Sequence, residues 1–284
     1  MTPPRASGPG CILAARPLME KAMFEALLAK WDLVPDGAPI VTPTSRLLPV
    51  RRGGTPAMLK LACHEEEMRG HRLMVWWDGD GAAPVLAADG DALLMARAAD
   101  PGRLAGIARA GEDDAATLVL CAVAARLHTH RAAAVPELVP LADWFAALAP
   151  AAVAQGGLLQ NAAATAGDLL GSMSESVALH GDLHHGNVLD FGPPGWLAID
   201  PKGLKGERAF DYVNMLRNPD PASMTAPGRF ARQTALIAAT AGLDRERLLR
   251  WTLAFAGLSA AWRLADGEDP APDLVLADLA QAAL

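Results

Sequence analysis

The spacing of apolar residues changes along the chain. Between residues 40 and 98, short apolar runs are separated by turn pairs such as Gly53-Gly54 and Asp89-Gly90, a pattern that is typical of strands joined by hairpins. From residue 103 onwards, apolar residues recur every three or four positions over longer segments, as they do on one face of a helix. The pattern therefore predicts a β-rich part followed by a mostly helical part.

The first part is predicted to hold five strands and one helix that packs with them. The strands cover residues 40–42, 46–51, 56–62, 84–88 and 92–98. Acidic residues favour the first turn of a helix because they complement its dipole, and the run Glu65 to Glu67 opens a predicted helix that continues to Trp77. A helix over residues 18–31 and a loose, proline-rich arm over residues 1–17 are expected before the strands.

Helices dominate the second part. They are predicted over residues 113–130, 141–148, 153–170, 207–217, 229–241, 244–266 and 273–283. The turn residues of the segment 99–102 mark the boundary between the two parts. We therefore expect an α+β chain of two lobes, with residues 1–98 forming an antiparallel sheet lobe and residues 99–284 forming a helical lobe.

Composition and charge narrow the class of protein. The chain has 284 residues, of which 51% are hydrophobic and 20% are charged, and its net charge is -7. A nucleic-acid-binding surface needs an excess of Lys and Arg, so a nucleic-acid partner is not expected. An acidic surface instead favours a cationic small molecule.

Apolar segments and cysteines indicate where in the cell the protein is located. No apolar run reaches the length of about 18 residues that a membrane span requires, and the apolar segment 11–15 is too short for the core of a signal peptide. Cys11, Cys63 and Cys121 are odd in number and far apart, which favours reduced thiols over a disulfide framework. We expect a cytoplasmic protein without a membrane partner, either a monomer or a homodimer.

The candidate chemistry lies in one segment of the second part. Residues 180–187 read His-Gly-Asp-Leu-His-His-Gly-Asn, and Asp200 follows the short apolar run 196–199, which is predicted to be one arm of a hairpin. A carboxylate that accepts a hydroxyl proton (Asp182), an amide oxygen five residues later (Asn187) and a carboxylate at a strand end are the groups that magnesium-dependent phosphoryl transfer needs. The pattern predicts a kinase-like fold.

Two other interpretations fit parts of this segment. The histidines of the segment 180–187 are suggestive of a zinc site, but zinc takes ligands from two separated clusters and no second cluster follows. An aspartate in a glycine-rich loop is often only a turn residue. The combined spacing of Asp182, Asn187 and Asp200 favours the kinase interpretation over both.

The strand over residues 56–62 carries a lysine among apolar residues. Lys60 is either an edge residue that reaches water or a buried residue with an anionic partner, and the kinase pattern favours the second, because a strand lysine there binds the phosphates of ATP and is oriented by a helix glutamate. Both Glu66 and Glu67 are candidates for that partner, and Glu67 is preferred.

Other nucleotide contacts follow from position along the chain. Thr44 and Ser45 lie where a kinase places a loop over the phosphates, although this loop lacks the usual glycines. Met95, Arg97 and Ala98 lie where the connection between the lobes would read an adenine edge.

These motifs resemble a known family. The segments 180–187, 199–203 and 206–211, with 31–37, 57–60, 76–82 and 258–262, are similar to the aminoglycoside phosphotransferases, and more narrowly to the streptomycin 6-kinase and hydroxyurea phosphotransferase subfamily. The resemblance spans about residues 30–270. It implies that Asp182 is the catalytic base, that Asn187 and Asp200 bind magnesium and that Lys60 binds the phosphates.

The resemblance also implies where the acceptor binds. Acidic residues of the helical lobe would receive its cationic groups, with a tryptophan lining the pocket; the candidates are Asp211, Trp262, Asp266, Glu268 and Asp269. From its position, Asp211 is either a group on the phosphate side or a brace of the catalytic loop through backbone hydrogen bonds, and the second role is preferred.

The function expected from the sequence is transfer of the γ-phosphoryl group of ATP, with Mg²⁺, to a hydroxyl of a streptomycin-type aminoglycoside. A kinase of hydroxyurea or another small metabolite is the first alternative, and a non-catalytic nucleotide-binding protein is the second. The sequence leaves open the acceptor, the hydroxyl and the choice between ATP and GTP.

Overall fold

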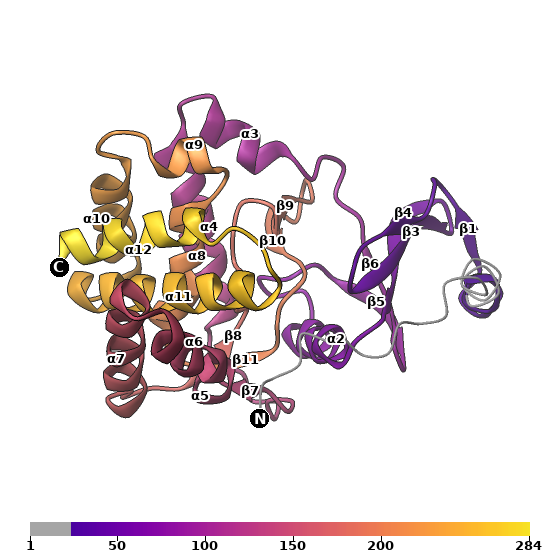
Figure 1. Ribbon diagram of the computed structural model, residues 1–284. Coiled ribbons are helices and arrows are strands. Elements are labelled where there is room, and N and C mark those ends of the chain that lie inside the picture. Colours follow the sequence, from indigo (N-terminus) through magenta and orange to yellow (C-terminus); the bar gives the residue numbers. More distant parts are fainter. Residues whose placement is uncertain (1–23) are drawn as a thin grey trace.

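The structure is a computed structural model that describes residues 24–284. A sheet with one helix beside it forms one lobe, and helices form most of the other (Figure 1). The predicted arm over residues 1–17 and the start of the helix predicted over 18–31 lie outside the described residues, while residues 24–30 are helical. The predicted order, a β-rich part followed by a mostly helical part, is therefore present.

A six-stranded antiparallel sheet forms the first lobe. Its strands are β1 (Leu33–Pro35), β2 (Ile40–Val41), β3 (Ser45–Arg52), β4 (Thr55–Ala62), β5 (Val85–Asp89) and β6 (Ala92–Ala96). Their order is β1-β3-β4-β6-β5, and β2 also pairs with β3. The prediction of five strands is wrong by one, because β1 is only three residues long and too short to give an alternating pattern.

The alternation along β4 positions Lys60. Ala57, Leu59 and Leu61 are buried in one apolar cluster with residues of β3 and β6. Successive side chains of a strand point to opposite faces, so Lys60 faces the other way, toward helix α2 (Glu65–Trp77). The turn before β4 is made by Gly53 and Gly54, whose φ angles of 53° and 80° are those that a two-residue hairpin requires.

Helices and short 3₁₀ segments build the second lobe. They are α3 (Arg103–Arg109), α4 (Asp113–Leu127), α5 (Leu141–Trp144), η1 (Phe145–Ala147), α6 (Leu148–Gln155), α7 (Gly157–Gly171), η2 (Arg208–Tyr212), α8 (Val213–Arg217), α9 (Pro221–Met224), α10 (Arg229–Ala241), α11 (Arg245–Ala265) and α12 (Ala271–Ala283). α11 runs through the centre of this lobe and is buried along most of its length.

Most predicted helices are present, with corrected ends. The helix predicted over 153–170 is interrupted at Gly156, whose φ of 66° belongs to the left-handed region. The helix predicted over 207–217 begins as the 3₁₀ segment η2. Two short helices, α3 and α9, were not predicted. The connection between β6 and α3 contains the predicted lobe boundary at residues 98 and 99.

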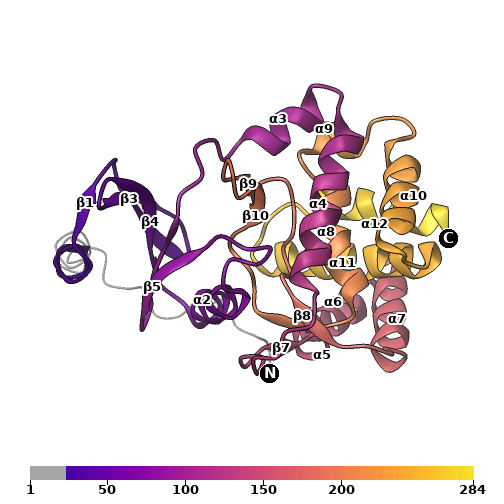
Figure 2. The same ribbon diagram turned by 180° about the vertical axis from the view of Figure 1, so that it is seen from behind.

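Short strands hold the loops that carry the candidate chemistry. β9 (Val188–Asp190) and β10 (Trp196–Ala198) form the predicted hairpin. β8 (Val177–Leu179) and β11 (Leu204–Gly206) pair with each other, and β7 (Val139–Pro140) pairs with β11. Figure 2 shows these strands between helix α2 and the helical lobe. Within residues 24–284, no helix is long and apolar enough to cross a membrane.

Candidate active site

Two loops meet at the junction of the lobes. The loop from β8 to β9 carries Asp182 and Asn187, and the loop from β10 to β11 carries Asp200. Backbone hydrogen bonds join them: the Ile199 amide donates to the Asn187 carbonyl over 2.9 Å, and the Lys202 amide donates to the His180 carbonyl over 2.7 Å. The three residues that the sequence singles out for catalysis are thus brought together.

Asp211 holds the first loop through hydrogen bonds to its backbone. Its carboxylate accepts the His180 amide over 2.9 Å and the Gly181 amide over 2.7 Å, and His128 Nε2 lies 2.8 Å from it. Burial acts to raise the pKa of Asp211, but the hydrogen bonds with His128 and with the Gly181 amide outweigh burial and lower the pKa. The carboxyl therefore stays ionised.

The role of Asp211 as a substrate ligand has to be corrected. Its side chain has no exposed surface, and its two oxygens already bind the loop backbone. No acceptor can reach this carboxylate without displacing the catalytic loop. The structure therefore favours the alternative role, which is to brace the loop.

Asp182 keeps an accessible carboxylate. Its side chain is 29% exposed, and the Asn187 amide donates to its backbone carbonyl over 2.9 Å. Asn214 of α8 donates from Nδ2 to Oδ1 of Asp182. A carboxylate that is held on one side and open on the other is suited to receive the proton of a substrate hydroxyl.

Lys60 bridges the lobes. Its ammonium forms ion pairs with Glu67 of α2 and with Asp200. Burial acts to lower the pKa of Lys60, but the charges of Asp200 and Glu67 outweigh it and raise the pKa, so the lysine is charged. The same attraction lowers the pKa of Asp200 against the opposing effect of burial. The preferred pairing of Lys60 with Glu67 is present.

A second lysine pairs with the neighbouring glutamate. Lys202 Nζ lies 2.9 Å from Glu66 Oε1, and its side chain is 25% exposed. Burial opposes the charge on Lys202, but Glu66 and Asp182 raise its pKa. Sequence reasoning missed this residue, although a cation two positions after Asp200 was a usable signal. Consecutive glutamates of α2 thus hold one lysine from each lobe.

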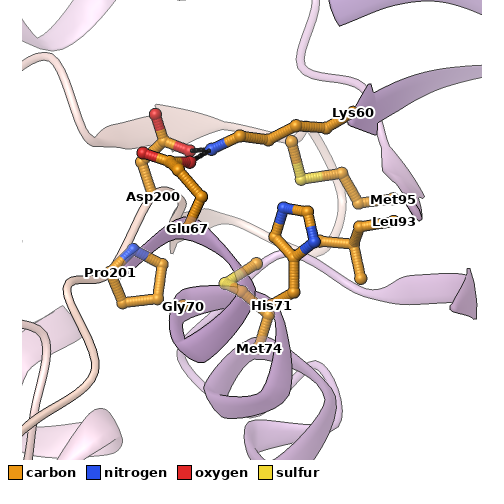
Figure 3. A pocket seen from close by; sticks show the side chains of 9 residues that line it. All are labelled: Lys60, Glu67, Gly70, His71, Met74, Leu93, Met95, Asp200 and Pro201. Atoms are coloured by element: carbon orange, nitrogen blue, oxygen red, sulfur yellow. Dashed lines mark hydrogen bonds and ion pairs between the residues drawn. The ribbon is translucent and has the colours of Figure 1, made fainter. Parts of the chain in front are cut away.

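A small cavity lies behind Lys60. It is lined by Lys60, Glu67, Gly70, His71, Met74, Leu93, Met95, Asp200 and Pro201 (Figure 3). Burial and the charge of Lys60 lower the pKa of His71 to about 4, so its ring is neutral near pH 7. Met95, a predicted nucleotide contact, therefore lies in the same cavity as the lysine.

The other predicted nucleotide contacts lie around this cavity or beyond it. Ser45 is buried, and its hydroxyl lies 2.9 Å from that of Thr42, so it points into the turn. Thr44 is half-buried in the same turn. Arg97 pairs with Asp36 beside β1, and Ala98 is half-buried in the connection between the lobes. Their contact with nucleotide stays a prediction.

The predicted acceptor residues gather where α11 ends. Trp262 packs edge-on against Trp144, with ring centroids 5.2 Å apart. Asp266, Glu268 and Asp269 are exposed in the loop between α11 and α12. The Arg263 guanidinium donates to Glu268 over 3.1 Å, and Asp269 accepts the Ala271 amide over 2.9 Å. Their contact with an acceptor stays a prediction.

The oxygen atoms of Asn187 and Asp200 suit magnesium. Magnesium takes one or two protein oxygens together with phosphate oxygens and water. Asp200 is ionised and its side chain is 42% exposed, and the Asn187 amide donates through Nδ2, which leaves its oxygen available. Among residues 24–284, no group of three or more His, Cys, Asp or Glu residues could hold a metal ion by itself.

Known proteins resemble this chain over most of its length. It is 51% identical to a streptomycin 3''-kinase of Klebsiella pneumoniae over 84% of this chain and 92% of that protein. It is 36% identical to a streptomycin 6-kinase of Streptomyces glaucescens (92% and 88% covered) and 35% identical to a hydroxyurea phosphotransferase of Kitasatospora aureofaciens (87% and 74% covered).

The fold has solved counterparts. An aminoglycoside phosphotransferase from Streptomyces rimosus, solved with ADP and streptomycin, matches with a TM-score of 0.54 and 18% identity, covering 84% of this chain and 97% of that one. The predicted kinase-like fold is thereby confirmed. Residues 30–267 also match the sequence profile described as aminoglycoside/hydroxyurea antibiotic resistance kinase. The chain belongs to this family of resistance kinases.

Proposed function

We propose that this protein transfers the γ-phosphoryl group of ATP to a hydroxyl of streptomycin. The observation that carries the proposal is the junction of Asp182, Asn187, Asp200 and Lys60 between two lobes, because these are the groups that such a transfer uses. The choice of streptomycin as the acceptor rests on the two streptomycin kinases named above.

Asp182 receives the proton of the attacking hydroxyl. The acceptor oxygen forms a bond to the γ-phosphorus while the bond from that phosphorus to the β–γ bridging oxygen breaks, and ADP leaves. The hydroxyl proton passes to the exposed carboxylate of Asp182 and then to water. The geometry of Asp182 is fixed before the substrate arrives, which lowers the entropic cost of the transition state.

Cationic groups of the chain neutralise the phosphates. Lys60 is held by Glu67 on the sheet side, and Lys202 is held by Glu66 on the loop side. Charge that develops on the transferring group is stabilised by fixed cations in a partly buried site. Asn187 and Asp200 would hold Mg²⁺, which supplies further charge neutralisation when bound.

The acceptor is proposed to be modified at position 3''. The chain is more similar to the streptomycin 3''-kinase, at 51% identity, than to the streptomycin 6-kinase, at 36%. Exposed carboxylates near Trp262 offer partners for the cationic groups of an aminoglycoside. We also place the reaction in the cytoplasm, where ATP is abundant.

Hydroxyurea is a second candidate acceptor. The observation that favours it is the 35% identity to a hydroxyurea phosphotransferase. A non-catalytic nucleotide-binding role is less consistent with the site, because Asp182 is accessible and Lys60 is paired as an active kinase requires.

Acceptor-dependent ADP release tests the proposal. Purified protein is mixed with ATP and Mg²⁺ and with streptomycin, other aminoglycosides, hydroxyurea or common cellular alcohols, and phosphorus-coupled NMR locates the phosphate on the product. We expect stimulation by streptomycin and a product phosphorylated at 3''. Asp182→Asn is expected to abolish turnover and leave ATP binding intact, whereas Asp278→Asn, an exposed aspartate of α12, serves as the matched control.

Two outcomes would overturn the proposal. Phosphorylation of hydroxyurea alone would move the function to the second candidate. A folded protein that binds ATP but releases no more ADP with any acceptor than without one would remove the aminoglycoside assignment.

A further inference from the structure

A chain of polar contacts leads from the catalytic carboxylate into the helical lobe. Asn214 of α8 donates from Nδ2 to Oδ1 of Asp182. Asn214 is 3% exposed, whereas the side chain of Asp182 is 29% exposed. A buried amide therefore holds a carboxylate that remains partly exposed.

Arg217 fixes the direction of that amide. Its Nε donates to Oδ1 of Asn214 over 2.5 Å. A guanidinium only donates and an ionised carboxylate only accepts, so the amide has to present its oxygen to Arg217 and its nitrogen to Asp182. Rotating the amide would lose both hydrogen bonds and leave buried polar atoms unpaired, which is costly.

Arg217 itself is held from several sides. Its Nη1 donates to Ser259 over 2.9 Å and to Asp273 over 2.8 Å, and its guanidinium lies 5.0 Å from the ring centroid of Phe255. Asp273 is 2% exposed. The guanidinium is thus anchored on α11 and α12 and has little freedom to turn away from Asn214.

The anchor also borders the loop that carries the candidate acceptor residues. Arg263 donates from Nε to Asp273 over 2.7 Å and from Nη1 to Glu268 over 3.1 Å. The buried carboxylate of Asp273 therefore joins two arginines, one that leads to Asp182 and one that leads to the loop between α11 and α12.

We propose that Asn214 and Arg217 are positioning residues that fix the orientation of Asp182 for proton acceptance. The proposal rests on the proposed function, because it assigns their role through the base of that reaction. Orientation matters most in the transition state, while ATP and acceptor are bound largely by other groups. We call the contacts from Arg217 through Asn214 to Asp182 the relay. Loss of the relay is therefore expected to lower kcat and to leave both KM values nearly unchanged.

Kinetics of three variants test the relay. Asn214→Leu keeps a branched side chain and removes the hydrogen bonds, and we expect kcat to fall roughly 10- to 100-fold with both KM values within about threefold. Arg217→Lys keeps a cation but lacks the fork that binds three partners, so a smaller loss is expected. Since Arg217 acts through Asn214, the double variant should lose no more than Asn214→Leu alone.

A matched control separates this effect from a general loss of stability. Asn161 of α7 donates to Gln281 over 2.9 Å on the exposed surface, so Asn161→Leu removes a side-chain amide hydrogen bond far from the relay. It is expected to keep wild-type kcat. Thermal unfolding of each variant confirms that the protein assayed is folded.

Crystal structures give a readout that needs no acceptor. We expect a single orientation of Asp182 in the wild type with ADP and more than one in Asn214→Leu. Unchanged kcat in Asn214→Leu, losses that multiply in the double variant, or an unchanged single orientation of Asp182 would overturn the relay. If the wild type phosphorylates no acceptor, the proposed function fails, and the two crystal structures still decide the inference.

Discussion

The carbonyl oxygen of Pro201 lies 2.3 Å from the place where a Cβ on Gly70 would be. Only a glycine lets helix α2 approach the loop of Asp200 this closely. The approach brings Glu67 to Lys60 and Glu66 to Lys202, so the packing of one helix against one turn sets both ion pairs of the site.

Gly70→Ala is therefore expected to impair catalysis and stability together. The added methyl group would meet the backbone of Pro201, which cannot move aside as a flexible side chain can, so α2 has to shift. Overpacking of this kind costs about 1–3 kcal/mol. Chemical denaturation measures the change in stability, and steady-state kinetics measure the change in kcat. Gly167→Ala in α7 is the control, because nothing lies within 4 Å of a Cβ there and alanine favours a helix over glycine. Equal behaviour of the two variants would contradict the packing argument.

Lys202→Met is expected to lower kcat about 100-fold, the size of effect seen when one fixed donor to a developing charge is removed. The physical reason is the loss of a charged group that lies near both Asp182 and Asp200. Lys205→Met, an exposed lysine on β11, controls for loss of charge alone. Initial rates with saturating ATP and acceptor measure the effect, and a Lys202→Met enzyme with wild-type kcat would refute the role.

The sequence was informative where chemistry fixes spacing. The separation of Asp182, Asn187 and Asp200 follows from the loops that a phosphoryl-transfer site needs. The hairpin of β9 and β10 was predictable from a short apolar run bounded by turn residues. Lys60 was found because a charge inside an apolar strand needs a partner.

Features that depend on packing between distant segments were not predictable. Asn214 is separated from Asp182 by 32 residues, and no pattern in a single sequence marks an amide as its partner. Asp211 could be assigned to substrate or to backbone until its burial was known. β1 was missed because it gains its partners from β3 and not from its own pattern.

Asp211→Asn separates bracing from substrate binding. An amide of the same size presents one donor to the backbone amides of His180 and Gly181, which are donors themselves. We expect a loss of about 1–3 kcal/mol in unfolding free energy and a large drop in kcat, because the catalytic loop moves. A substrate ligand would instead show a raised acceptor KM with unchanged stability. Denaturation and steady-state kinetics on one preparation distinguish the two.

The stability of the protein is expected to depend on His71 between pH 4 and 6.5. Burial and the charge of Lys60 lower the pKa of His71 to about 4 from the value of 6.5 expected in an unfolded chain. Between these values the unfolded state binds a proton that the folded state does not, so unfolding becomes easier as the pH falls. The contribution is complete above pH 6.5, is lost on the way down to pH 4, and amounts to roughly 3 kcal/mol at most.

His71→Phe tests this dependence because it keeps a ring of similar size and removes the titration. As the pH falls from 6.5 to 4, the wild type should lose more unfolding free energy than His71→Phe. Above pH 7 the difference between the two proteins should stay constant. His130→Phe replaces an exposed histidine and serves as the matched control for exchanging a histidine for a phenylalanine. Parallel curves for wild type and His71→Phe would mean that His71 takes up its proton in the folded protein as readily as in water, and that the cavity behind Lys60 opens to solvent.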